Sequence, residues 1–237
     1  MKAVILAAGK GTRMKDITKT IPKPMVIVKG KPMLEHIVEF IKTAGITELG
    51  LVVGYKKEIV IDHFGDGSAF GVSITYIEQI EQNGTGAALG LAKDFAAGES
   101  VFFTFGDVMT TEDNYQAMVE MYNAGGCEVL MGLNTVDDPY RGAAVYLDEA
   151  KNVIDMIEKP EKGTSTTNLN NAGLMVLSAA IFDYTSRLTP SPRGEYELTD
   201  VFGMIRSDGK AVKGYELSGY WKDVGTPEDL DKINEML

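Results

Sequence analysis

The chain contains 237 residues, of which 44% are hydrophobic and 24% charged, and its formal net charge is −11. These values are typical of a soluble globular protein, and no apolar run approaches the roughly 18 residues that suggest a membrane span. The negative charge repels nucleic-acid phosphates and anionic lipids, so we expect neither nucleic acid nor a membrane as a partner. The first apolar segment runs into Gly9 without the pattern of a signal peptide, and we therefore expect a cytoplasmic protein.

The first half of the chain alternates predicted strands and helices. Lys2 to Ala8 is a β-branched and aliphatic run that ends at glycine, as a buried parallel strand does. After a loop from Gly9 to Met25, apolar residues at helical spacing from Met33 to Ile41 predict a helix that closes near Gly45. The remaining predicted elements are strands over 49–53, 72–77 and 101–105 and helices over 56–64 and 87–95. This alternation predicts an α/β fold with a Rossmann-like, doubly wound sheet.

The second half has a different pattern, with more strands and fewer helices. Its predicted strands cover 128–133, 143–147, 153–157 and 172–177, which indicates a small, partly antiparallel lobe on a mixed sheet. Thr226, Pro227 and the two acids that follow supply an N-cap, a first-turn proline and first-turn negative charge, so we expect a final helix. No linker interrupts the sequence. We therefore expect one domain over 1–237, without an appended β-helix of the acyltransferase type.

A glycine-rich basic loop follows the first predicted strand. Gly9 and Gly11 would let backbone N–H groups approach phosphate oxygens, and a solvated basic turn is the alternative. Met14 stands where the Rossmann fingerprint needs a third glycine, and no Gly-Lys-Ser/Thr closes a Walker A loop, so a nicotinamide enzyme and a P-loop NTPase are both disfavoured. A single acid, Asp16, opposes the cations of this segment, which are Lys10, Arg13, Lys15, Lys19 and Lys23. The excess of positive charge indicates a pocket for a small polyanion.

Another candidate position follows the predicted strand over 101–105. That strand ends in Gly106 and Asp107, at the edge where α/β sheets collect their ligands. We therefore expect Asp107 to belong to a functional site.

Several segments together resemble the sugar-1-phosphate nucleotidylyltransferases, the group that includes glucose-1-phosphate thymidylyltransferases and uridylyltransferases. They occur in family order and span nearly the whole chain. The matching segments are 6–14, 22–25, 76–79 with 84–85, 105–107, 158–160, 171–173, 194–200 and 221–227. The resemblance implies the nucleotide-diphospho-sugar transferase type of fold, with the antiparallel lobe binding the sugar.

The resemblance also implies which residues serve the triphosphate. Arg13 and Lys23 would hold it, because negative charge builds on the α-phosphoryl group and on departing pyrophosphate. Asp107 and Asp223 match the family's two magnesium-binding acids, and two carboxylates plus phosphate oxygens are a suitable Mg²⁺ ligand set. The nucleotide-binding residues implied by the resemblance are Leu6, Ala8, Gly9, Gly11, Thr12, Gln79 and Gly84. The Gln79 amide can offer a donor and an acceptor to uracil or thymine, which favours a pyrimidine.

For the sugar phosphate, the resemblance points to residues of the second half. Glu158 would hold sugar hydroxyls and Lys159 the sugar phosphate, and the other residues implied are Gly142, Asn171 and Gly173. The sequence departs from the family pattern in two places. Gly86 stands where alanine is common, and Tyr140-Arg141 reverses the more frequent Arg-Tyr order, which puts the aromatic contact to the sugar in doubt.

The implied reaction is a direct displacement that joins a sugar 1-phosphate to a nucleoside triphosphate, with Mg²⁺ as cofactor and without a side-chain nucleophile. Glucose 1-phosphate with dTTP or UTP is the favoured pairing. Two alternatives stay open: a guanylyl- or cytidylyltransferase acting on mannose, heptose or choline phosphate, and a non-catalytic homologue that senses nucleotide sugars. Family members often associate, so a homo-oligomer is compatible with the resemblance.

Overall fold

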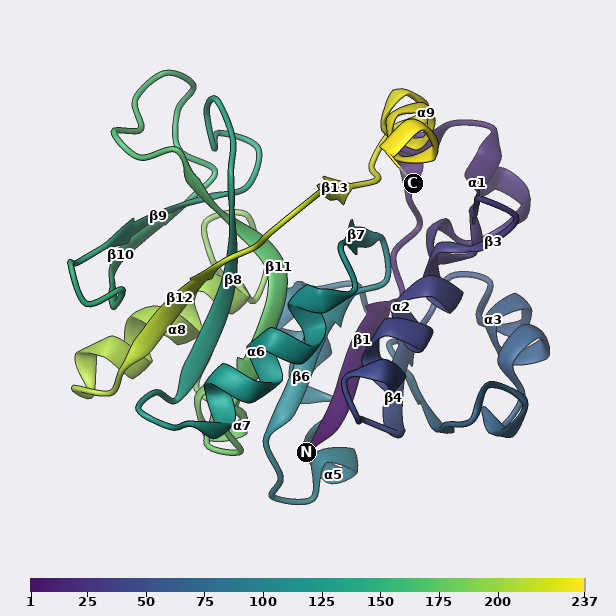
Figure 1. Ribbon diagram of the computed structural model, residues 1–237, viewed down its shortest axis with the longest axis horizontal. Coiled ribbons are helices and arrows are strands. Elements are labelled where there is room, and N and C mark those ends of the chain that lie inside the picture. The colour runs from purple at the N-terminus through teal and green to yellow at the C-terminus, as the bar shows by residue number, and fades with distance from the viewer. Residues whose placement is uncertain (237) are drawn as a thin grey trace.

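A nine-stranded mixed sheet forms the centre of the computed structural model, which describes residues 1–236 (Figure 1). Leu237, the last residue of the predicted domain, lies outside the described residues. Strand β1 (Lys2–Ala7) is flanked by parallel strands β4 (Glu48–Val53) and β6 (Val101–Phe105), and β5 (Ser73–Glu78) lies beyond β4. This half of the sheet confirms the predicted parallel strands.

The second half of the chain continues the same sheet through mostly antiparallel pairs. Strand β11 (Leu169–Leu177) pairs antiparallel with β6, and the sheet then divides into two branches. One branch holds β9 (Ala143–Leu147) and β10 (Val153–Glu158), and the other holds β8 (Val129–Thr135) and β12 (Val212–Glu216). This confirms the predicted mixed sheet, in which the strands of the second half are partly antiparallel.

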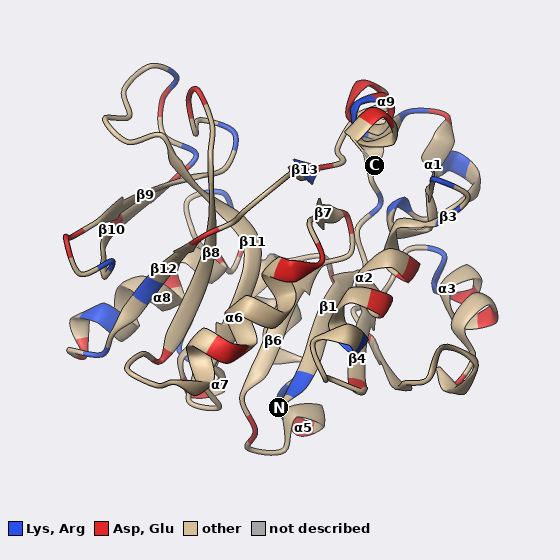
Figure 2. Cartoon of the chain, in the orientation of Figure 1, with Lys and Arg blue, Asp and Glu red and all other residues tan. Residues whose placement is uncertain are grey.

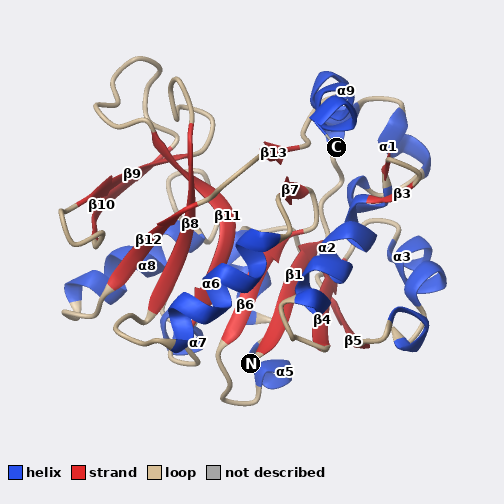
Figure 3. Ribbon diagram, in the orientation of Figure 1, coloured by secondary structure: helices blue, strands red, loops and turns tan. Residues whose placement is uncertain are grey.

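Helices cover both faces of the sheet (Figure 3). Strand β1 shows why, because alternate residues of a strand point to opposite faces. Ala3 and Ile5 join one apolar core, and Val4 joins the other. The first core includes residues of α2 (Met33–Thr43) and α6 (Asp113–Asn123), and the second includes residues of α4 (Thr85–Gly90), α7 (Ile181–Thr185) and α8 (Leu198–Ser207). Burial on both sides explains the near-continuous apolar sequence of β1.

Short elements complete the described chain. The helices are α1 (Ile17–Thr20), α3 (Lys57–Phe64), α5 (Lys93–Ala96), α9 (Pro227–Met236), η1 (Thr12–Met14), η2 (Lys23–Met25) and η3 (Ser68–Phe70). The strands are β2 (Ile27–Val28), β3 (Lys31–Pro32), β7 (Val108–Thr110) and β13 (Trp221–Asp223). No described helix is long and apolar enough to cross a membrane.

Two sequence predictions about helices differ from the structure. The single helix expected over 87–95 is wrong: α4 ends at Gly90, a poor helix former, and α5 begins after Ala92, whose ψ of 4° is not helical. The segment over 9–25 is not a plain loop, since it contains η1, α1 and η2. The final helix is confirmed with its cap, because Thr226 Oγ1 accepts from Asp229 N at 3.2 Å and Asp229 Oδ2 accepts from Thr226 N at 3.0 Å.

Gly84, at the start of α4, provides a test of this packing. Its φ is +122°, and a Cβ there would lie 2.6 Å from Tyr196 N and still closer to Tyr196 O. We expect Gly84→Ala to lower the free energy of unfolding by about 2–4 kcal/mol, through backbone strain and overlap. Gly203, within α8, is the control, because a Cβ there meets nothing within 4 Å. Gly203→Ala should raise the free energy of unfolding by about 0.5–1 kcal/mol. Urea denaturation measures both, and equal effects would contradict this packing.

Candidate active site

Three adjoining cavities open near the carboxyl ends of the parallel strands. Their volumes are about 240, 620 and 200 Å³, and we refer to them as the first, second and third cavities. Phe105, the last residue of β6, lines all three. Asp107 lines the first and second, while Gly142, Lys159 and Asn171 line the second and third. The cavities therefore form one composite cleft, at the sheet edge where α/β proteins bind ligands.

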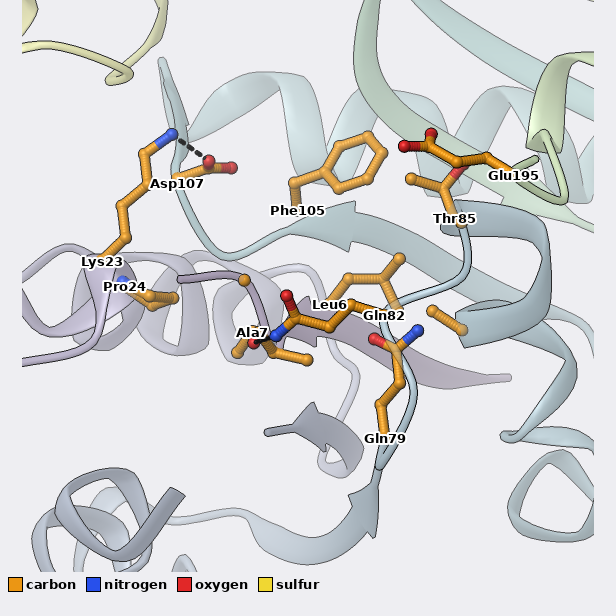
Figure 4. A pocket seen from close by; sticks show the side chains of 14 residues that line it. Leu6, Ala7, Lys23, Pro24, Gln79, Gln82, Thr85, Phe105, Asp107 and Glu195 are labelled. Atoms are coloured by element: carbon orange, nitrogen blue, oxygen red, sulfur yellow. Dashed lines mark hydrogen bonds and ion pairs between the residues drawn. The ribbon is translucent and has the colours of Figure 1, made fainter. Parts of the chain in front are cut away.

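A charged cluster lies where the first and second cavities meet. The Lys23 ammonium contacts Asp107 Oδ2, and its Nζ lies 3.4 Å from Asp223 Oδ1 (Figure 4 shows the Lys23–Asp107 pair). Arg13 Nη2 lies 3.9 Å from Asp223 Oδ2. We call these four residues the charged cluster. The structure thus brings together all four residues that the sequence resemblance assigned to the triphosphate and the metal.

Backbone pairing explains how residues so distant in sequence meet. Asp107 lies between β6 and β7, directly before β7, and β13 pairs antiparallel with β7, so that Asp223 lies opposite Val108. The Val224 N–H donates to the Asp107 carbonyl at 3.0 Å and fixes the same register. Lys23 lies in η2 between two prolines, which restrict the backbone that carries it. Its side chain is 9% exposed and extends toward both carboxylates.

Burial and neighbouring charges shift the pKa of two residues of the charged cluster, Lys23 and Asp223. Burial opposes the charge of Lys23, but the carboxylates of Asp107 and Asp223 outweigh it and raise the pKa of Lys23. Partial burial and the negative charge of Asp107 raise the pKa of Asp223, against the opposing effects of Lys23 and Arg13. The two carboxylates therefore affect each other as well as the cations beside them.

The carboxylates of Asp107 and Asp223 fit a magnesium ion. Both reach one cationic nitrogen, so oxygens from both can approach one positive centre. Within residues 1–236 there is no group of three or more His, Cys, Asp or Glu side chains that could form a complete protein cage for a metal. Mg²⁺ does not need such a cage, because it usually binds one or two carboxylates and completes its shell with waters and phosphate oxygens.

The glycine-rich loop borders the first cavity and carries Arg13. Leu6, Ala8 and Gly9 line this cavity, whereas Gly11 and Thr12 line none of the three. Two hydrogen bonds stabilise the loop at Gly11, because its carbonyl accepts from Met14 N at 2.9 Å and from Thr18 Oγ1 at 2.8 Å. The short helix α1 that follows carries one basic residue, Lys19, and the first turn of α9 carries two acidic residues, Glu228 and Asp229; Figure 2 colours these helices by charge.

The other part of the first cavity is lined by amides. Gln79 is 8% exposed and lines this cavity together with Gly84; both are among the nucleotide-binding residues expected from the resemblance. Gln82 was not predicted. Its Nε2 donates to the Ala8 carbonyl at 2.8 Å, so it links this wall to the glycine-rich loop, and Figure 4 shows both glutamine side chains away from the Lys23–Asp107 pair.

The third cavity holds the residues expected at the sugar. Glu158, Lys159, Asn171, Gly173 and Gly142 all line it. Asn171 Oδ1 accepts from Gly173 N at 3.0 Å, within a stretch of β11 where the register to β8 shifts between Asn171 and Met175. Such irregularities redirect side chains next to sites. The Lys159 N–H donates to the Gly142 carbonyl at 2.7 Å, which joins the two segments.

Arg193 and Glu197 also line the third cavity, although neither was predicted from the sequence as a site residue. Arg193 NH2 donates to Glu197 Oε1 at 2.6 Å and lies 3.8 Å from Glu158 Oε1. Burial raises the pKa of Glu158, although Lys159 and Arg193 lie nearby. The matched segment over 194–200, which begins directly after Arg193, was the available signal.

The reversed Tyr140-Arg141 pair changes the wall of the second cavity. Arg141 lines this cavity and its Nε donates to the Tyr140 hydroxyl at 2.9 Å, whereas Tyr140 lines none of the three cavities. A cation therefore stands where the more frequent order would place an aromatic ring.

The chain is similar to several known proteins. The nucleotidyl transferase family matches residues 2–237. The low-salt glycan biosynthesis nucleotidyltransferase Agl11 of Haloferax volcanii is 40% identical, over 100% of this chain and 66% of its own length. The bifunctional protein GlmU of Methanococcus maripaludis is 41% identical, over 99% of this chain and 54% of its own length. The chain thus spans between about half and two thirds of these curated relatives.

A solved structure has the same fold. It is a Bacillus anthracis protein proposed to be a glucose-1-phosphate thymidylyltransferase, crystallised with sucrose. The TM-score is 0.91 at 32% identity, and the match covers 99% of this chain and 94% of the other. With the family match over nearly the whole sequence, the chain belongs to the nucleotidyl transferase family.

Proposed function

We propose that the chain joins a sugar 1-phosphate to a nucleoside triphosphate, with release of pyrophosphate. Glucose 1-phosphate with UTP or dTTP is the pairing that we favour. The observation that carries the proposal is the charged cluster, which lies between a cavity lined by amides and backbone and cavities lined by Glu158, Lys159 and Asn171. In this arrangement the first cavity would hold the base, the charged cluster the reacting phosphates, and the other cavities the sugar.

The reaction needs alignment and charge neutralisation more than proton transfer. An oxygen of the sugar phosphate attacks the α-phosphorus, and the bond from the α-phosphorus to the oxygen of the leaving pyrophosphate breaks. The attacking phosphate is already anionic, so no general base is required. Arg13 and Lys23 would hold the triphosphate, and Lys159 would hold the sugar phosphate. Asp107 and Asp223 would hold a Mg²⁺ ion, which when bound neutralises charge on phosphate oxygens.

The choice of a pyrimidine rests on the wall of the first cavity. No hydrogen-bond partner within the described chain occupies the Gln79 amide, whereas the Gln82 amide donates to Ala8. An amide offers one donor and one acceptor, which suits the imide edge of uracil or thymine. Glu158 supports a neutral sugar, because a carboxylate can accept hydrogen bonds from two hydroxyls.

Pyrophosphate release from ATP, GTP, CTP, UTP and dTTP, each with several sugar 1-phosphates and Mg²⁺, tests the proposal. We expect the highest kcat/KM with UTP or dTTP and glucose 1-phosphate. A preference for GTP or CTP would replace the proposed nucleotide but retain the reaction type. Binding of a nucleotide sugar without turnover of any pair would instead indicate a sensor.

Asp107 and Asp223 provide a second test, because residues that serve one ion act as a unit. Replacing either by Asn keeps its size and removes one negative charge, so we expect turnover to fall by about 100-fold or more in each single variant. Asp107→Asn/Asp223→Asn should lose little beyond either single variant. Steady-state kinetics across a Mg²⁺ titration measure this. Fully multiplicative losses, or near-normal turnover of a single variant at limiting Mg²⁺, would disprove a shared ion.

A further inference from the structure

The Lys23 ammonium stands between the two carboxylates proposed to bind the metal. It contacts Asp107 Oδ2 and lies 3.4 Å from Asp223 Oδ1, although these partners are 84 and 200 positions away in the sequence. The Lys23 side chain is 9% exposed, compared with 24% for Asp107 and 44% for Asp223. The most buried member of the cluster is thus a cation, and it contacts the oxygens that a metal would use.

Charge balance makes this arrangement unfavourable for a second cation. Lys23 and Arg13 carry two positive charges, and Asp107 and Asp223 carry two negative charges, so the charged cluster is neutral as it stands. A divalent ion entering alone would be repelled by the ammonium, and these interactions are strong where water is partly excluded. A triphosphate changes the balance, because it brings several negative charges.

Lys23 borders the space in which such a phosphate would bind. It lines the first cavity together with Gly9 of the glycine-rich loop, whereas Asp223 lines only the second cavity. Asp107 lines both. A phosphate group bound in the first cavity would therefore lie on the Lys23 side of the cluster and offer its ammonium new acceptors.

We propose that Lys23 occupies the metal position between Asp107 and Asp223 when no nucleotide is bound. The metal then binds tightly only after the Lys23 ammonium has moved from these carboxylates to the phosphate oxygens of a bound triphosphate. The inference rests on the metal site of the proposed function. It assigns Lys23 two successive partners: the carboxylates before the nucleotide arrives and phosphate oxygens afterwards. The nucleotide and the metal would then bind cooperatively, since each favours the same position of the lysine.

Mn²⁺ binding to the nucleotide-free chain, followed by electron paramagnetic resonance, tests this without any turnover. We expect Lys23→Met to bind Mn²⁺ at least about tenfold more tightly than the unmodified chain, because a repelling charge is removed next to both ligands. Lys23→Arg keeps the charge and should not show this gain. In Lys23→Met/Asp223→Asn the gain should be lost, because one ligand is missing.

Lys2 is a matched control. Its Nζ also lies 3.7 Å from two carboxylates, those of Glu48 and Glu99, and its side chain is 13% exposed. It lies at the opposite end of β1 from the glycine-rich loop. Lys2→Met removes the same charge and should leave Mn²⁺ affinity unchanged. An equal gain in Lys2→Met would mean that net charge alone is responsible, and the proposal would be overturned.

Thermal unfolding gives a second readout if Lys23→Met is less stable. Two carboxylates without their lysine repel each other, so Mg²⁺ should raise the Tm of Lys23→Met more than that of the unmodified chain. Equal shifts, or unchanged Mn²⁺ affinity in Lys23→Met, would refute the inference. A chain without turnover on any substrate pair, but with the gain in Lys23→Met, would refute the proposed reaction and leave this inference intact.

Discussion

The short antiparallel pairing of β7 with β13 is the contact on which the site depends. It returns a segment near the end of the described chain to the edge of the parallel sheet and sets Asp223 beside Asp107. The buried amide of Asn114 holds the segment before β13 in place. Asn114 Nδ2 donates to the Ser218 carbonyl, and Asn114 Oδ1 accepts from Ser218 N, both at 2.9 Å. Because Asn114 is fully buried, losing these bonds would leave unpaired polar groups in the core.

The residues of the charged cluster both stabilise one another in the folded chain and provide the groups that ligands would bind. Two partly buried carboxylates at one point of a protein repel each other, and the chain offsets this with a lysine that is itself almost fully buried. A ligand can then use what the folded chain already contains: positive charge for phosphates and oxygens for a metal. The site is preorganised, so little of the binding free energy is spent on collecting these groups.

Much of the fold could be predicted from local patterns. The buried parallel strands have long apolar runs, and the capping box at Thr226 is visible in the sequence. The pairing of β7 with β13 could not be predicted in this way, because each strand has only three residues and no periodicity indicates a partner so distant. Helix α6 was missed because few of its residues are apolar and buried. The resemblance named the four residues of the charged cluster, whereas Gln82 and Arg193 became apparent only from their hydrogen bonds and the cavities that they line.

The central claim is that Asp107 and Asp223 share one metal ion next to the reacting phosphate. Anomalous diffraction from crystals grown with Mn²⁺ and a non-hydrolysable triphosphate analogue tests it most directly. We expect one Mn²⁺ peak within coordination distance of an oxygen from each carboxylate, with the Lys23 ammonium on a phosphate oxygen. A metal peak that contacts neither carboxylate, or a Lys23 ammonium still between the two carboxylates in the presence of bound triphosphate and metal, would contradict the account.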